Sequence, residues 1–238
     1  MTTQQLVSQT SRILHKKYGY GKTTLVATSL CSDEVNRPLE QAFRHVYSDC
    51  FSLGGLAGFP FAGVTGYNAM AHHIPDNGSC LLVYGPHVGV NEHGQLGTVD
   101  RRGRQKGGAC CGSAAAALGY VNSVSPRQQH QVTTASRTDP LDTQQAFVES
   151  TLLPYAARLQ KADDTMLELP KVLFEVQDEL LGQIIGKSAG AVSGSGKICL
   201  LGGIQINTPA GDADYFLPLR FDIRDSSGAL LENLLLAL

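Results

Sequence analysis

A chain of 238 residues with 42% hydrophobic and 17% charged residues is long enough for a substantial core and has a globular composition. The formal net charge of −2 argues against the basic surface with which proteins bind nucleic acid or anionic membranes. The most apolar run, ALLENLLLAL at residues 229–238, is too short to span a membrane and carries Glu232. We therefore expect neither nucleic acid nor a membrane as a partner.

The elements of the first half of the chain follow from periodicity and turn residues. Residues 2–17 have helical spacing and end at a glycine-rich turn. Residues 25–30 are apolar and rich in β-branched side chains, which predicts a strand. A second helix is expected at residues 38–47, with Pro38 in its first turn. Residues 51–66, FSLGGLAGFPFAGVTG, hold no charge, so we expect them to lie against the core or a pocket. Residues 80–84 are a second buried strand.

The second half continues the alternation of strands and helices. Residues 91–109 are polar and turn-rich, and a helix of small residues begins at Cys111. Residues 142–186 have helical spacing, which we expect Pro154 and Pro170 to break. Two strands follow at 197–208 and 214–225, and a Leu-rich helix is expected at the end. The pattern predicts an α/β fold in one domain, residues 1–238, with a central, partly parallel sheet flanked by helices.

Two glycine–lysine pairs, at Lys22 and Lys197, superficially resemble phosphate-binding loops. In each case the glycine that begins such a loop is missing, because Lys16 and Ala191 stand at its position. The sequence therefore argues against a nucleotide-hydrolysing enzyme.

Three potential metal ligands stand at the ends or beginnings of predicted elements. Cys31 directly follows one strand and His87 follows another, and the carboxyl ends of parallel strands meet at one edge of a sheet. Cys111 begins a helix, where the helix dipole lowers the pKa of a thiol. Two thiolates, a neutral imidazole and an open fourth position fit a catalytic zinc site.

The residues alone leave this set open. Cys110 is an alternative to Cys111, and a lone cysteine is more often a small buried hydrophobic residue than a ligand. No CxxC or HxxxH spacing supports the choice. Asp33 and Arg37, four positions apart, are close enough to pair. The pair is either a surface ion pair that contributes about 0–1 kcal/mol to stability, or a gate in which Arg37 keeps Asp33 away from the metal.

Several motifs in combination resemble the limiting-CO2-inducible B protein family of algae and bacteria, a β-carbonic-anhydrase-like group also linked to the theta class. They are CSDEVNR at residues 31–37, LGGLAGFPFAGVTG, GPHVG around His87, GRQ followed by ACCG around Cys111, and LLGGIQINT. The resemblance covers roughly residues 20–222. It implies a β-carbonic-anhydrase-like fold, a homodimer and one zinc ion per chain.

Carried onto this chain, the resemblance makes Cys31, His87 and Cys111 the zinc ligands and Asp33 and Arg37 the gating pair. Ordinary β-carbonic anhydrases have the arginine two residues after the aspartate and the second cysteine three residues after the histidine. Here the arginine follows by four residues and the cysteine by 111 − 87 = 24, which fits the limiting-CO2 branch.

The resemblance thus implies a zinc carbonic anhydrase that hydrates CO2 reversibly to bicarbonate through zinc-bound hydroxide. Phe59 and Phe61 would line a dry wall for CO2, Arg37 or Arg104 would hold bicarbonate, and His73 would relay protons. One alternative is an inactive member of the family that binds bicarbonate or a partner in a CO2-concentrating system. Another is a thiol hydrolase with Cys31 as nucleophile and a histidine as base.

The expected location is cytoplasmic. Six cysteines in a chain of this length do not form a disulfide scaffold, and the N-terminus lacks the apolar segment of a secretory signal. The first 32 residues are basic and free of acids, as in transit peptides, but Leu6, Ile13 and Leu14 at near-helical spacing favour a packed helix. An organelle stroma is the alternative if the protein comes from an alga.

Overall fold

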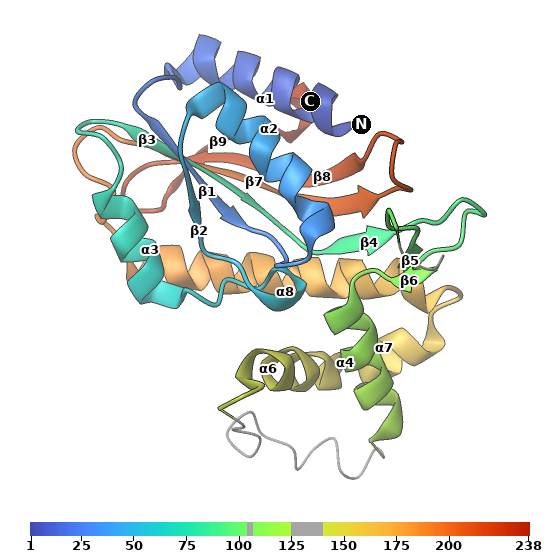
Figure 1. The fold of residues 1–238 in the computed structure, drawn as a ribbon. Helices are drawn as coiled ribbons and strands as arrows, with labels where there is room; N and C mark the ends of the chain where they lie inside the picture. Colours follow the sequence, from blue (N-terminus) through green and yellow to red (C-terminus); the bar gives the residue numbers. More distant parts are fainter. Residues whose placement is uncertain (104–106, 125–139) are drawn as a thin grey trace.

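The computed structural model describes residues 1–103, 107–124 and 140–238. Its centre is a seven-stranded sheet with the order β2-β1-β3-β7-β8-β9, in which β4 also pairs with β7 (Figure 1). The parallel strands are β1 (Thr24–Ser29), β2 (Cys50–Ser52), β3 (Ser79–Tyr84), β4 (His87–Gly89) and β7 (Ile198–Asn207). Antiparallel strands β8 (Tyr215–Arg224) and β9 (Leu230–Asn233) complete one edge. This confirms the expected α/β fold with a central, partly parallel sheet; in the structure most of the strands are parallel.

Helices cover both faces of the sheet. One face carries α1 (Thr3–Tyr18) and α2 (Arg37–Tyr47), and the other carries α3 (Gly63–His72) and α8 (Thr165–Lys187) (Figure 1). Successive residues of β1 serve the two faces in turn: Val26 packs in the cluster of α1 and α2, whereas Leu25 and Ala27 pack in that of α3 and α8. Burial on both faces explains why the central strands are almost continuously apolar.

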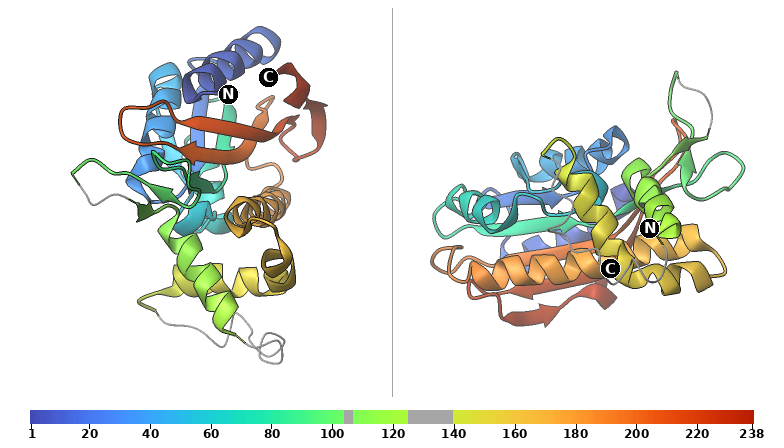
Figure 2. Two further views of the ribbon diagram at one scale, coloured as in Figure 1. Left: turned by 90° about the vertical axis from the view of Figure 1, so that its right-hand side faces the viewer. Right: turned by 90° about the horizontal axis from the view of Figure 1, so that it is seen from below.

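A group of helices, green to yellow in Figure 2, extends away from the sheet on the side of α8. It consists of α4 (Gly112–Ser123), α6 (Thr143–Leu152) and α7 (Ala156–Lys161), packed with the first half of α8. We call these helices the helical lobe. Their apolar cluster includes Cys31, Cys111, Ala57 and Phe59. None of the helices in the described ranges is long and apolar enough to cross a membrane.

Short elements connect the main ones. A two-stranded hairpin is formed by β5 (Thr98–Val99) and β6 (Gly108–Ala109). The 3-10 helices are η1 (Glu34–Asn36), η2 (Leu56–Gly58), η4 (Leu153–Tyr155) and η5 (Leu235–Ala237). Of these, η1 and the hairpin flank the candidate site described below.

Two expectations about the second half were wrong. Pro170 does not break a helix, because α8 runs through it from Thr165 to Lys187. Pro170 is one of the buried residues of α8, with Leu169 and Val172, and this packing offsets the backbone hydrogen bond that proline cannot donate. The break at Pro154 is confirmed: α6 ends at Leu152, and η4 contains the proline.

The predicted Leu-rich C-terminal helix is also absent. Residues 230–233 form β9, which pairs antiparallel with β8, and only a 3-10 turn follows. The two strands are joined by a turn in which the Asp225 side chain accepts hydrogen bonds from the backbone of Ser227 and Ala229. Gly228 adopts a φ of +88° there. These turn residues are typical of a hairpin and outweigh the helical propensity of the leucines.

The strand that carries His87 continues the line of β3. Tyr84 of β3 lies opposite Gly202 of β7, and after Gly85 and Pro86 the chain pairs with the same strand again, placing His87 opposite Gln205. At Gly85 φ is +143°, and a Cβ atom would lie 1.7 Å from the carbonyl oxygen of Gly203. Glycine is therefore required at this interruption. His87 is held inside a parallel ladder and not on a loop beyond it.

Candidate metal centre

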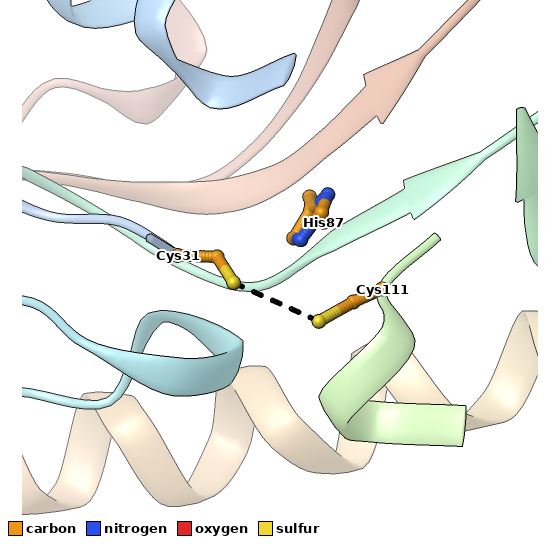
Figure 3. A group of neighbouring side chains, drawn as sticks. All are labelled: Cys31, His87 and Cys111. Atoms are coloured by element: carbon orange, nitrogen blue, oxygen red, sulfur yellow. Dashed lines mark hydrogen bonds between the residues drawn. The ribbon is translucent and has the colours of Figure 1, made fainter. Parts of the chain in front are cut away.

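Cys31, His87 and Cys111 converge at the carboxyl edge of the parallel strands (Figure 3). Cys31 follows β1, His87 begins β4, and Cys111 is the N-cap residue of α4. One ligand atom from each lies within 4.8 Å of the others, and the two sulfurs are 3.7 Å apart. All three side chains are buried. Residues from three distant parts of the chain thus form one compact cluster.

The two nitrogens of His87 have different surroundings. Nδ1 is 2.8 Å from Oδ1 of Asn207. Nε2 is buried and has no hydrogen-bond partner among the described residues, and one ring nitrogen faces the two sulfurs (Figure 3). A buried polar atom left without a partner is costly. A metal ion between the sulfurs and Nε2 would satisfy it.

The protonation equilibria of the cluster are strongly perturbed. The hydrogen bond from Cys111, aided by His87 and opposed by burial, lowers the pKa of Cys31 to about 4. The same hydrogen bond, together with burial, raises the pKa of Cys111. Burial acts to lower the pKa of His87, but the sulfurs of Cys110, Cys111 and Cys31 raise it overall. Of the two thiols, that of Cys31 is therefore the more easily ionised, and the thiolate is the form that binds a metal ion.

The donor set fits zinc. Zinc is bound by cysteine thiolates and histidine nitrogens, and catalytic sites provide three protein ligands with a fourth position open. A Zn–S distance of about 2.3 Å and a tetrahedral angle place two sulfurs about 3.8 Å apart. The observed separation of 3.7 Å between Cys31 and Cys111 agrees with this value.

Asp33 lies next to the cluster and is paired with an arginine that the sequence did not point to. Its Oδ2 accepts a hydrogen bond of 2.8 Å from Nη2 of Arg101, while its Oδ1 accepts a longer one from the backbone of Val35. Burial acts to raise the pKa of Asp33, but polar neighbours that include His87 and Arg101 lower it. Asp33 is thus an ionised carboxylate, and its partner Arg101 comes from the loop between β5 and β6.

The expected ion pair between Asp33 and Arg37 is not the one that forms. Arg37 donates a 2.7 Å hydrogen bond to the carbonyl oxygen of Cys31 and pairs with Glu40 at 3.0 Å. Because Arg37 begins α2, its side chain folds back over the loop that leaves β1. It therefore fixes the backbone of Cys31 and leaves Asp33 to Arg101.

A second donor group overlaps the first. One ligand atom each from Asp33, His87 and Cys110 also lies within 4.8 Å of the others. Cys110 is fully buried, and its sulfur is 3.4 Å from Nδ1 of His87. The Asp33 carboxylate therefore lies close to the imidazole of His87.

A cavity of about 1080 Å³ opens above the cluster. Its lining includes Cys31, Asp33, Arg101 and Cys111 from the site, and Leu56 as an apolar contribution. A much smaller cavity of about 10 Å³ lies behind His87 and Cys111 and is lined by residues such as Val88 and Leu173. The sulfurs are thus accessible from one side and packed against apolar side chains on the other.

The remaining predicted site residues lie in different places. Phe59 and Phe61 form an aromatic group with Phe147, with ring centroids 5.4–6.0 Å apart, and pack in the apolar cluster that contains Cys31 and Cys111. Neither lines the large cavity. His73 is exposed at the end of α3, edge-on to Phe51, and does not line that cavity. Arg104 lies outside the described residues.

Sequence reasoning missed Arg101 and Asn207. The basic segment that contains Arg101 was noticeable, but a short hairpin gives no periodic signal that predicts its position. Asn207 had a detectable signal: with Gln205, it is a polar residue at the carboxyl end of an otherwise apolar, buried strand. Buried polar groups need partners, so such residues often point to a site.

Comparisons with known proteins agree with this geometry. Residues 1–225 match the family described as limiting CO2-inducible proteins B/C β-carbonic anhydrases. The crystal structure of PtLCIB4, a homolog of the limiting CO2-inducible protein LCIB, is similar with a TM-score of 0.89 and 53% identity, covering 98% of this chain and 94% of the other. The crystal structure of LCIB itself has a TM-score of 0.74 at 20% identity, covering 98% and 93%. No curated protein sequence matches the chain.

The family match, together with the mostly parallel sheet and the buried group of two cysteines and a histidine, makes this a β-carbonic-anhydrase-like protein. The chain belongs to the family of limiting CO2-inducible proteins B/C, and the resemblance inferred from its motifs is confirmed.

Proposed function

We propose that the chain is a zinc-dependent carbonic anhydrase that converts CO2 and water reversibly into bicarbonate and a proton. The observation that carries this proposal is the buried Cys31, His87 and Cys111 cluster beneath an open cavity. The three side chains would hold the metal through Sγ of each cysteine and Nε2 of the histidine. Zinc in such a site lowers the pKa of a water ligand towards 7 and so supplies hydroxide at neutral pH.

Asp33 and Arg101 would orient the nucleophile. An ionised Asp33 can accept a hydrogen bond from the attacking oxygen, which turns a lone pair of that oxygen towards the carbon of CO2. Arg101 would act as a positioning residue that keeps the carboxylate from taking the fourth ligand position. In this proposal Arg101 replaces Arg37 as the gating partner, and Arg37 fixes the Cys31 backbone.

The substrate is small, apolar and uncharged, and the product carries a charge. Leu56 on the cavity wall offers CO2 an apolar surface, and Phe59 with Phe61 would support this wall from behind. The guanidinium of Arg101 at the cavity wall can attract bicarbonate. The proton released by hydration would leave through the open cavity to solvent buffer.

Stopped-flow CO2 hydration, measured on protein of known zinc content, tests the proposal. We expect one zinc ion per chain and measurable hydration, both lost in Cys31→Ser. The matched control is Cys50→Ser, because Cys50 lies on β2 outside the cluster. Zinc-loaded wild-type protein without hydration above the buffer rate would disprove the enzymatic function. Metal-free protein that cleaves esters and loses this activity on alkylation of Cys31 would instead support a thiol hydrolase.

A catalytically inactive member that binds bicarbonate or a partner is the second candidate. The observation that favours it is the closeness of Asp33 to His87 within the second donor group. A carboxylate that binds the metal would close the fourth position and prevent turnover. Zinc content without hydration, with isothermal titration showing bicarbonate binding, would select this candidate.

The wider setting of the proposal rests on the family. We propose that residues 1–238 act as one zinc-binding domain, that two copies form a homodimer, and that the protein works in a reducing, cytoplasmic environment or an organelle stroma. Sedimentation equilibrium of the zinc-loaded protein tests the dimer, and a mass equal to one chain would contradict it.

A further inference from the structure

Asn207 is a buried polar residue that contacts the imidazole of His87. It is the last residue of β7 and is 1% exposed. Its Oδ1 is 2.8 Å from Nδ1 of His87, a contact that joins residues 120 positions apart in the chain. The parallel pairing of β4 with β7 sets this contact, because it fixes both strands in register at the point where the site is built.

The orientation of the Asn207 amide follows from its other contacts. Its Nδ2 donates a 3.0 Å hydrogen bond to the carbonyl oxygen of Val35 and lies 3.5 Å from Oδ2 of Asp214. Both of those partners can only accept, so the NH2 group must face them and Oδ1 must face His87. Oδ1 can only accept as well, so Nδ1 of His87 must carry the proton.

Cys110 does not change this assignment. Its sulfur lies 3.4 Å from Nδ1 of His87 and 3.7 Å from Oδ1 of Asn207. Sulfur is a weak acceptor, and the amide oxygen is both closer and stronger. With the proton held on Nδ1, the lone pair of neutral imidazole lies on Nε2, the atom that has no partner in the described structure and belongs to the ligand cluster.

Asn207 also contacts the loop that carries Asp33. Val35 lies in η1, two residues after Asp33, and its carbonyl oxygen accepts hydrogen bonds from both Asn207 and Gln205. The Gln205 contact is longer, at 3.3 Å, and within the described residues the Gln205 side chain makes no hydrogen bond to His87. Gln205 and Asn207 therefore share the hydrogen bond to Val35, and only Asn207 also contacts the His87 imidazole.

We propose that Asn207 is a positioning residue of the metal centre: its amide oxygen holds the His87 proton on Nδ1 and so presents Nε2 to the metal. This inference rests on the proposed zinc site and assigns a role outside its three ligands. Partners that orient a histidine ligand typically change metal affinity by 10- to 100-fold when they are removed.

Three variants separate the imidazole contact from the loop contact. Asn207→Leu removes both contacts at similar volume, Asn207→Asp keeps an acceptor for Nδ1 but loses the donor to Val35, and Gln205→Leu removes only a donor to Val35. Zinc affinity is measured by competition with a chromophoric chelator. We expect Asn207→Leu to weaken zinc binding about 10- to 100-fold, and the other two to stay within about threefold of wild type.

A second readout reports the proton directly. Long-range ¹H–¹⁵N spectra of the zinc-loaded protein should place the His87 ring proton on Nδ1 in wild type, Asn207→Asp and Gln205→Leu. If Asn207→Leu fails to fold, the wild-type and Asn207→Asp spectra still decide the question. A wild-type proton on Nε2, unchanged zinc affinity in folded Asn207→Leu, or an equal loss in Gln205→Leu would overturn the inference.

Neither readout depends on CO2 turnover. Zinc binding that follows the expected pattern without hydration would support the role of Asn207 and reject the carbonic anhydrase. Wild-type protein that binds no zinc would reject both.

Discussion

The carboxylate of Asp33 is paired with Arg101, 68 positions away, although Arg37 stands four positions away in the same motif. The pair joins the η1 loop to the β5–β6 hairpin. The side chain of Asp33 is 13% exposed and that of Arg101 is 21% exposed. Arg101 also contacts Glu34 at 2.8 Å, so the guanidinium spans two neighbouring carboxylates. The state of the proposed fourth ligand position thus depends on a segment outside the main sheet.

Removing this arginine is expected to close the site. In Arg101→Ala, Asp33 loses its strongest partner and is free to bind the metal, so CO2 hydration should fall by about 100-fold, the scale of a misplaced catalytic group. Zinc content should remain that of wild type. In cobalt-substituted protein, visible spectra should show thiocyanate binding to wild type and not to Arg101→Ala.

Arg102→Ala is the matched control, because Arg102 is the exposed neighbour of Arg101 on the same hairpin loop. It should behave like wild type in both assays. Adding Asp33→Asn to Arg101→Ala should restore thiocyanate binding, since the blocking carboxylate is gone. Equal hydration rates in Arg101→Ala and wild type would show that Arg101 is not needed to keep Asp33 away from the metal.

The adjacent cysteines should differ in their effect on metal binding. Cys111→Ser removes a proposed ligand, whereas Cys110→Ser removes a sulfur that contacts the other side of His87. A ligand present at 100 times its dissociation constant stabilises a folded protein by about 2.7 kcal/mol. We expect zinc to raise the melting temperature of wild type and Cys110→Ser but not of Cys111→Ser, as scanning calorimetry can measure. The opposite order would make Cys110 the ligand.

Gly85 should be far less tolerant of a side chain than a helical glycine. The Cβ atom in Gly85→Ala would overlap the carbonyl oxygen of Gly203, so β4 would have to shift with His87. We expect a loss of more than about 3 kcal/mol in the free energy of unfolding, as for severe overpacking. Gly119→Ala in α4 meets no atom within 4 Å and should instead stabilise by about 1 kcal/mol. Urea denaturation measures both, and a mild effect at Gly85 would contradict the close approach.

Tyr67 should make stability sensitive to alkaline pH. Burial raises its pKa above the ordinary value of 10.0, and its hydroxyl has no partner among the described residues. The unfolded chain loses this proton near pH 10 while the folded chain keeps it, so stability present below pH 10 is lost as pH rises. Above pH 10 this single group lowers the free energy of unfolding by about 1.4 kcal/mol for each pH unit.

The Tyr67→Phe variant tests this effect. It should lose less stability than wild type between pH 8 and pH 11 in urea denaturation, and at pH 8 it should be at least as stable, because an unpaired buried hydroxyl is removed. Tyr215→Phe, on the exposed part of β8, is the matched control. Parallel losses for wild type and Tyr67→Phe would refute the expectation.

Local patterns in the sequence predicted much of the fold. The strand at residues 25–30 and the helix at 38–47 correspond to β1 and α2, because their apolar spacing reflects burial on a sheet face. The errors at Pro170 and in the last ten residues have another origin. Tertiary packing kept α8 continuous, and pairing with β8 turned a leucine-rich segment into a strand.

The candidate site was predictable where its residues stand at the ends of elements. Cys31 and Cys111 adjoin a strand and a helix, so their positions could be inferred from topology. Arg101 could not, because its pairing with Asp33 depends on how a short hairpin folds over η1. Spacing in the motif favoured Arg37, but a guanidinium at the start of α2 finds the nearer carbonyl of Cys31.

The three proposed ligands also come from different parts of the architecture. Cys31 and His87 belong to the strands, whereas Cys111 opens the first helix of the helical lobe. An ion bound by all three would cross-link the lobe to the sheet edge, much as a disulfide joins two segments. Metal release would then remove a link between the helical lobe and the sheet edge.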